Sequence, residues 1–136
     1  MNKDLSKLFA AATAARSHAY APYSRYHVGA AIRLQDSGLI FGGCNVENAS
    51  YGGTLCAERT AIVRAVAEQG PGIRVAELLL ITETPAPPCG MCLQVMSEFC
   101  DGGCPVHLAT PAGVHRTVTL NDLLPIRFDS QNLDTP

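Results

Sequence analysis

The sequence predicts an α/β fold in which one mixed β-sheet carries helices on both of its faces. Helical and strand-like segments follow one another in the order α-β-β-α-β-α-β-β-α, which is typical of such layered packing. Residues 75–82 form a near-continuous apolar run, as expected for a central strand covered on both sides. The chain has 136 residues without an internal repeat or linker. We therefore expect residues 1–136 to form a single domain, with a polar tail from about residue 129.

The N-terminal third predicts a helix followed by a hairpin. Residues 4–17 are rich in alanine and end before a turn at 21–24, so they indicate a helix. Residues 27–34 and 39–46 have the composition of two strands. The turn Gln-Asp-Ser-Gly at 35–38 joins these strands as in a short hairpin.

The middle third places a helix between a polar loop and the apolar strand. Residues 45–54 are small and polar, the composition of a loop that carries binding groups. Residues 56–69 are rich in alanine and are followed by Gly-Pro-Gly at 70–72, so they predict a second helix that stops there. The apolar run at 75–82 is the strand that follows this helix.

The C-terminal third predicts a helix and a second strand pair. Residues 84–88 form a proline-rich loop. The last of its prolines, Pro88, stands directly before residues 89–99 and favours the start of a helix there. Residues 105–109 and 114–119 predict two strands around a Thr-Pro-Ala-Gly turn. Residues 120–124 then form a short helix or turn.

The composition excludes several classes of partner. A net charge of −2 gives no electrostatic attraction to nucleic acid or to an anionic membrane. Only 6% of the residues are aromatic and tryptophan is absent, which disfavours a base-stacking surface for single strands. No run of 18 apolar residues is present, and the N-terminal segment lacks the features of a targeting peptide. We expect a cytoplasmic protein that binds a small molecule rather than nucleic acid or a membrane.

The six cysteines indicate a metal site rather than disulfides. Three disulfides would need an oxidising compartment, and nothing in the sequence points to one. Cys89 and Cys92 lie three residues apart, so on a helical turn both face the same way and two thiolates can hold one zinc ion. Cys56 is followed two residues later by Glu58, and this pair can address the same ion only at the start of a helix.

Three thiolates leave the fourth position of a zinc ion open for water, as in catalytic zinc sites. Zinc there generates hydroxide from water, and Glu58 would carry the proton. The starts of helices stabilise thiolates, and Arg59 would add electrostatic support to a centre that three thiolates make negative. The sequence therefore predicts one zinc ion per chain, with the ligands Cys56, Cys89 and Cys92.

Two other interpretations stay open at this point. The Cys-x-x-Cys pair could be redox-active, or it could belong to a closed structural zinc site with Cys44, Cys100, Cys104 or a histidine as the fourth ligand. Cys100 and Cys104 have an unusual spacing for ligands and fit ordinary buried thiols better. The position of Glu58 between Cys56 and the later Pro-Cys-x-x-Cys motif favours the catalytic interpretation.

Four sequence blocks extend the pattern beyond these residues. They cover 20–31 (YAPYSRYHVGAA), 43–51 (GCNVENASY), 56–61 (CAERTA) and 88–94 (PCGMCLQ). In this order they resemble the cytidine deaminases, and among them the small homotetrameric branch with three cysteine zinc ligands. The resemblance spans about residues 5–128. It implies a three-layer α/β/α sandwich around a five-stranded mixed sheet, and the deamination of cytidine and 2′-deoxycytidine in pyrimidine salvage.

The resemblance also implies roles for residues outside the metal cluster. Asn45 and Glu47 correspond to a pair that holds the ribose 3′-hydroxyl, and an amide with a carboxylate can both donate to and accept from a hydroxyl. The backbone of Ala57 corresponds to a contact with the pyrimidine carbonyl. Tyr26 corresponds to an aromatic residue that lines the base pocket. Tyr51 and Phe128 correspond to residues that reach the active site of a neighbouring subunit. For Tyr26 and Phe128, plain core packing is the alternative.

Three departures from the family pattern leave the substrate open. Leu93 stands where arginine is common, so that Arg59 would compensate alone for the missing charge. The loop Pro85–Pro88 is shorter than usual, and Tyr26 replaces the usual phenylalanine. The alternative is therefore an aminohydrolase for a modified cytosine nucleoside or a blasticidin S-like cytosine nucleoside antibiotic. A polynucleotide-editing enzyme or a structural zinc module fits less well, because the chain lacks a basic face and Glu58 is present.

Overall fold

The computed structural model describes residues 1–133 and contains one five-stranded mixed sheet with helices on both faces. The strands are β1 (Gly29–Leu34), β2 (Ile40–Cys44), β3 (Val75–Ile81), β4 (Pro105–Thr110) and β5 (Gly113–Thr119). The helices are α1 (Lys3–Arg16), α2 (Ala57–Gln69), α3 (Gly90–Phe99) and α4 (Leu120–Leu123), with 3₁₀ turns η1 (Tyr51–Gly53) and η2 (Ser130–Leu133). Among the described residues, none of the helices has the length and apolar character needed to cross a membrane.

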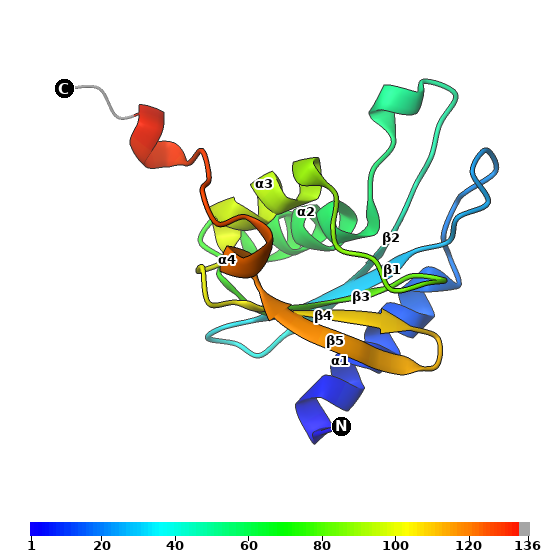
Figure 1. Ribbon diagram of the computed structural model, residues 1–136, viewed down its shortest axis with the longest axis horizontal. Coiled ribbons are helices and arrows are strands. Elements are labelled where there is room, and N and C mark those ends of the chain that lie inside the picture. Colours follow the sequence, from blue (N-terminus) through cyan, green and yellow to red (C-terminus); the bar gives the residue numbers. More distant parts are fainter. Residues whose placement is uncertain (134–136) are drawn as a thin grey trace.

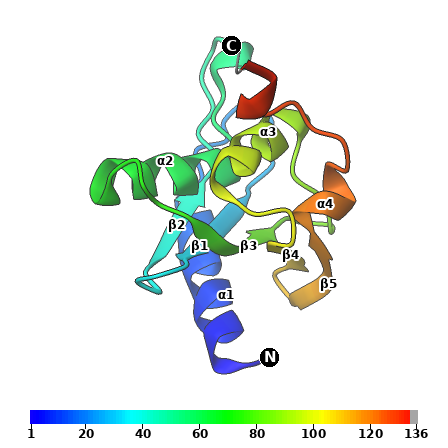
Figure 2. The same cartoon turned by 90° about the vertical axis from the view of Figure 1, so that its left-hand side faces the viewer.

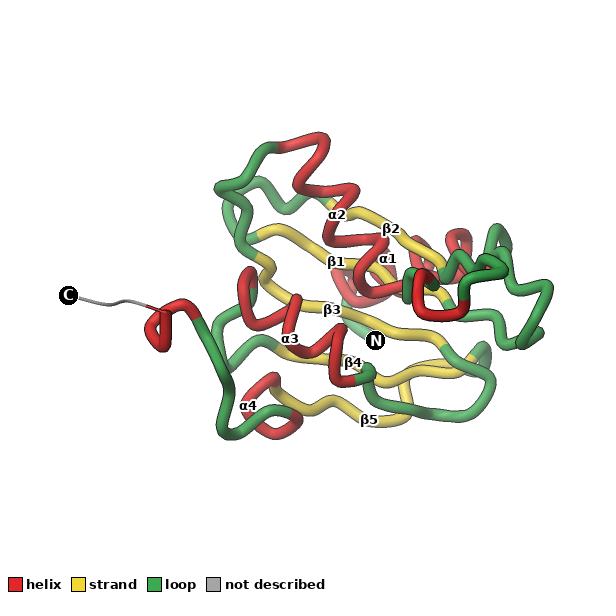
Figure 3. The backbone as a smooth tube through the Cα atoms, turned by 90° about the horizontal axis from the view of Figure 1, so that it is seen from above, coloured by secondary structure: helices red, strands yellow, loops and turns green. Residues whose placement is uncertain are grey.

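The helices form layers above and below the sheet. α1 covers one face, whereas α2 and α3 lie on the other, as Figures 1 and 2 show. The strand order is β2-β1-β3-β4-β5 (Figure 3). β3 and β4 are parallel, and all other neighbouring strands are antiparallel. The expected three-layer α/β/α sandwich with a five-stranded mixed sheet is thereby confirmed.

Several element boundaries differ from the expected ones. β1 begins at Gly29, two residues later than expected, because the residues before it belong to a loop that folds against the segment after β2. α2 and α3 each begin one residue later than expected, since the cysteine at each start is the N-cap. The expected polar tail contains the helical turn η2, which projects beyond the end of the sheet (Figure 1). The end of that tail, 134–136, lies outside the described residues.

The sheet separates two apolar cores. The larger one lies between the sheet and α2 with α3, and its fully buried side chains include Ile32, Ile62, Leu78 and Met96. The smaller one lies between the sheet and α1. Side chains alternate across a strand, so β3 with its apolar run contributes to both cores, as expected for a strand covered on both faces.

Two adjacent glycines let helices approach β2 from both sides. A Cβ atom on Gly43 would lie 2.4 Å from the backbone nitrogen of Ala61 and 2.6 Å from the carbonyl oxygen of Ala57, both in α2. A Cβ atom on Gly42 would lie 3.1 Å from the carbonyl oxygen of Ala11 in α1. The missing side chain at Gly43 therefore sets how closely α2, with its functional first turn, sits on the sheet.

Substituting Gly43 with alanine is expected to lower the free energy of unfolding by about 1–3 kcal/mol, the usual cost of overpacking. The added methyl group meets helix backbone, which cannot move aside as a side chain can. Urea denaturation measures the effect, with Gly72→Ala as the control because nothing lies within 4 Å of a Cβ atom there. Equal urea midpoints for the two variants would contradict the close packing of α2 against β2 at Gly43.

Candidate active site

Two cysteines meet where α2 and α3 begin. Cys56 is the N-cap of α2 and Cys89 the N-cap of α3, both with extended backbone angles. The two helices lie side by side on the same face of the sheet (Figure 3), so their starts bring together residues far apart in the chain. The Cys56 and Cys89 sulfur atoms are 3.8 Å apart. The expectation that Cys56 and Glu58 stand at a helix start is confirmed.

The geometry of the three sulfur atoms fits a zinc ion. The Sγ atoms of Cys56, Cys89 and Cys92 all lie within 4.8 Å of one another and form the thiol cluster. Two sulfurs bound at about 2.3 Å to a tetrahedral ion are about 3.8 Å apart, which matches the Cys56–Cys89 separation. Over residues 1–133, no fourth histidine, cysteine or carboxylate completes the group, so one ligand position stays open. All six cysteines are free thiols, so nothing supports the disulfide alternative.

Glu58 is buried in the first turn of α2 beside this cluster. Its residue exposure is only 4%, although it carries a carboxyl group. Burial, together with the negative charge of Cys56, raises the pKa of Glu58 to about 7. A group with such a pKa both takes up and releases a proton near neutral pH, as a general acid and base must.

Arg59 is placed to stabilise the thiolate of Cys56. Its Nη2 atom donates to the Cys56 sulfur at 3.5 Å and to the Thr54 carbonyl at 2.9 Å. The hydrogen bond from Cys92, reinforced by Arg59, lowers the pKa of Cys56 to about 5 against the effect of burial. The positive charge therefore lies where a three-thiolate centre needs it.

Replacing Arg59 with glutamine is expected to weaken zinc binding by about 10- to 100-fold, the usual effect of losing a partner of a metal ligand. Competition with a chromophoric chelator measures the affinity. Arg64→Gln is the matched control on the same helix, because the Arg64 side chain pairs with Glu68 and is largely exposed. Equal zinc affinities for the two variants would show that Arg59 does not support the thiolates.

An inner cavity of about 310 Å³ opens beside the thiol cluster. This volume is at the lower end of small-molecule sites, about 300–1,000 Å³. The cavity is lined at one end by Cys56, Ala57, Glu58 and Cys89, and elsewhere by Ser24, Tyr26, Val28, Asn45, Glu47, Thr54, Leu80 and Pro87. It thus joins a buried carboxyl group and the thiol cluster to an apolar wall and a polar end.

The polar end is built by Asn45 and Glu47, which follow β2. The Asn45 Oδ1 atom accepts from the Val28 backbone N–H at 3.0 Å, and its Nδ2 atom donates to the Tyr26 carbonyl at 2.7 Å. Glu47 Oε1 accepts from the backbone N–H groups of Tyr23 and Ser24. Both side chains are buried and held in fixed orientations.

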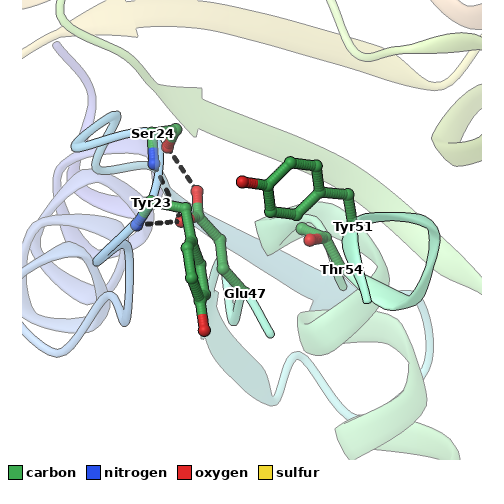
Figure 4. Close-up of a pocket in the computed structure, with 5 residues that line it drawn as sticks. All are labelled: Tyr23, Ser24, Glu47, Tyr51 and Thr54. Atoms are coloured by element: carbon green, nitrogen blue, oxygen red, sulfur yellow. Dashed lines mark hydrogen bonds between the residues drawn. The ribbon is translucent and has the colours of Figure 1, made fainter. Parts of the chain in front are cut away.

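An outer cavity of about 270 Å³ adjoins the inner one and shares Glu47 with it. Figure 4 shows its lining residues, among which Tyr51 from η1 stands opposite Glu47. The rings of Tyr23 and Tyr51 meet edge to face, with 5.7 Å between their centroids. Tyr51 is 75% exposed, so most of its ring is available to another molecule.

The structure brings the sequence-predicted site residues together, with the exception of Phe128. Tyr26 lines the inner cavity. Phe128 is exposed on the segment after α4, outside both cavities, and its carbonyl accepts from Gln94. Leu93 lies in the larger apolar core, so this departure from the family pattern contributes packing. Of the short loop Pro85–Pro88, Pro87 lines the inner cavity.

Sequence reasoning assigned no role to Ser24 or Thr54. Ser24 contacts Glu47 across 23 residues of chain, and Thr54 lines both cavities. Two signals lie at Ser24, the turn predicted at 21–24 and the sequence block 20–31 shared with the cytidine deaminases, but neither gave it a role. Neither hydroxyl has a spacing motif that would have revealed its place.

This fold and this site define a metal-dependent hydrolase with a buried carboxyl group beside its thiol cluster. The chain belongs to the cytidine and deoxycytidylate deaminase family, whose zinc-binding-region model matches residues 2–108.

Relatives match over nearly the whole chain. It is 43% identical to the cytidine deaminase of Sporosarcina psychrophila, with 96% of this chain and 95% of the relative covered. For the enzyme of Halalkalibacterium halodurans the identity is 41%, with coverage of 96% and 98%. The crystal structure of cytidine deaminase from Burkholderia pseudomallei matches with a TM-score of 0.83 and 46% identity, covering 94% of this chain and 100% of that one. The enzyme from Mycobacterium tuberculosis matches with a TM-score of 0.80 and 38% identity, covering 94% and 99%.

Proposed function

We propose that this protein is a zinc-dependent cytidine deaminase, which converts cytidine and 2′-deoxycytidine with water into uridine or deoxyuridine and ammonia. The observation that carries the proposal is the buried Glu58 beside an open cluster of three thiols, at one end of a nucleoside-sized cavity. Its curated relatives with 41–43% identity over nearly their full length are cytidine deaminases, which supports the same substrate class here.

Each part of the site has a role in this reaction. Cys56, Cys89 and Cys92 would hold a zinc ion, which would supply the Lewis acidity that activates water at neutral pH. Glu58 takes a proton from the attacking water, delivers it to the ring nitrogen, and then transfers a proton to the leaving amine. Asn45 and Glu47 orient the sugar through a hydroxyl, and the Ala57 backbone faces the base. The substrate loses its amine as ammonia and gains the oxygen of water as a carbonyl.

The assembly and cellular role are part of the same proposal. We propose a homotetramer with active sites shared between subunits, to which Tyr51 and Phe128 contribute. Large exposed apolar side chains near these positions support it, above all Ile126, which is 93% exposed. Deamination of free nucleosides fits pyrimidine salvage. Three ligand thiols that must stay reduced fit the cytoplasm.

The test is to incubate the purified, zinc-loaded protein with cytidine and to follow the ultraviolet absorbance of the cytosine ring. Loss of that absorbance with release of ammonia is the expected result. The same assay with 2′-deoxycytidine and with blasticidin S compares the substrate classes. A zinc-loaded protein that leaves cytidine unchanged but deaminates blasticidin S would replace the proposal by the modified-nucleoside alternative, for which Pro87 in the cavity wall would then be the first residue to vary.

A further inference from the structure

The segment from Tyr20 to Val28 folds around the residues that follow β2. The Tyr20 N–H donates to the Asn45 carbonyl at 3.0 Å, and the Glu47 N–H donates back to the Tyr20 carbonyl at 2.9 Å. The Asn45 N–H donates to the Val28 carbonyl at 3.4 Å. These backbone contacts bring Ser24 to the Glu47 carboxylate (Figure 4).

We propose that Ser24 is a positioning residue, whose hydroxyl fixes the Glu47 carboxylate so that one acceptor position stays aimed at a sugar hydroxyl of the substrate. This inference rests on the proposed function, since it assigns a support to the sugar-binding end of that same site. It concerns a residue that contacts the carboxylate and acts through it.

The hydrogen bonds of Glu47 leave room for one substrate hydroxyl. An ionised carboxylate offers about four acceptor positions. Oε1 uses two of them for the backbone N–H groups of Tyr23, at 3.0 Å, and Ser24, at 3.1 Å. Oε2 accepts from the Ser24 hydroxyl. One position on Oε2 therefore stays available, and the Ser24 hydroxyl determines which one it is.

Ser24 also ties Glu47 to Asn45. The Ser24 hydroxyl accepts from the Tyr26 N–H at 3.0 Å while it donates to Glu47. The carbonyl of Tyr26 in turn accepts from the Asn45 side-chain amide at 2.7 Å. Removing this hydroxyl thus loosens both members of the sugar-binding pair, because one residue connects them.

The turn is held in a conformation that only its surroundings explain. Arg25 has φ 59° and is the only described non-glycine residue with positive φ. Such a backbone persists where neighbouring contacts enforce it, and here the Arg25 N–H donates to the Ala21 carbonyl at 3.0 Å. The hydrogen bond from Ser24 is also the main cause that lowers the pKa of Glu47, which keeps this group ionised as an acceptor.

The test compares two substrates with and without the Ser24 hydroxyl. Ser24→Ala is expected to raise KM for cytidine about 10- to 100-fold, the scale of a hydrogen bond to a charged group. We expect kcat to change little, because the contact is the same in the ground state and the transition state. With 3′-deoxycytidine, which lacks the hydroxyl that Glu47 is proposed to bind, KM should be nearly equal for wild type and variant.

A matched pair keeps the test independent of folding defects. Threonine and valine have almost the same shape and differ by the hydroxyl, so Ser24→Thr should retain the wild-type KM and Ser24→Val should not. Ser37→Ala, in the exposed β1–β2 turn, is the control. Unchanged KM in the alanine and valine variants, or an equal increase with both substrates, would overturn the inference. Failure of the proposed function would appear separately, as a zinc-loaded wild type inactive on cytidine.

Discussion

Glu58→Gln is expected to lower kcat for cytidine by about 10²- to 10⁴-fold, the usual contribution of a general acid and base. Glutamine has nearly the shape of glutamate but cannot take up and release the proton that has to move from water to the substrate. The site should keep its zinc, because the three thiols and Arg59 are untouched. Steady-state kinetics with metal analysis of the same preparation measures both quantities.

The matched control is Glu68→Gln on the same helix. Glu68 is half exposed and pairs only with Arg64, at 2.8 Å, so its loss should change kcat less than about twofold, as for most surface ion pairs. Retained turnover in Glu58→Gln, at one zinc per chain, would remove Glu58 from the mechanism. Loss of zinc together with turnover would instead make it a support of the metal site.

Cys89→Ala is expected to reduce zinc affinity by more than about 100-fold. Losing a residue that only supports a metal ligand costs at most about 100-fold, and here a ligand itself is lost. Two thiols remain, and they cannot fill the tetrahedral set. Because a zinc ion held by three thiols stabilises the folded chain far more than the unfolded chain, the melting temperature should fall and respond much less to added zinc. Calorimetry with and without a chelator measures this response.

Cys44→Ala is the control for this substitution. Cys44 ends β2 and does not belong to the thiol cluster, so this variant should keep its zinc and its melting response. If Cys89→Ala also bound one zinc per chain with unchanged affinity, the assignment of Cys89 as a ligand would be wrong.

The order of elements and the thiol cluster could be predicted because both depend largely on local patterns. The alanine-rich composition of 56–69 and the Gly-Pro-Gly at 70–72 predicted α2, and the apolar run at 75–82 predicted β3. Cys89 and Cys92 are neighbours on one helical turn, so their spacing alone indicated that both thiols could bind the same metal ion. Cys56 could be assigned to the same ion only by placing it at the start of a helix, where Cys56 and Glu58 can both face the metal.

The rest of the site depends on tertiary contacts that no spacing encodes. Ser24 meets Glu47 only after the hairpin and the loop have folded together. Leu93 follows the ligand Cys92 directly in sequence, yet its side chain packs in the core because successive positions on a helix point in different directions. Position in a motif therefore did not reveal that Leu93 is a packing residue.

Cys56 and Cys89 are 33 positions apart in the chain, with the whole of β3 between them, and this separation affects how newly made chains acquire their metal. Of the three thiols in the cluster, only Cys89 and Cys92 are close enough in an unfolded chain to bind one ion together, so early metal binding uses two thiols and is reversible. Cys56 joins the other two thiols only when the sheet has formed, so tight zinc binding then indicates that folding is complete. Refolding in excess zinc should therefore trap unfolded chains in which two thiols bind an ion. The yield of active protein should be greatest near one equivalent of zinc per chain.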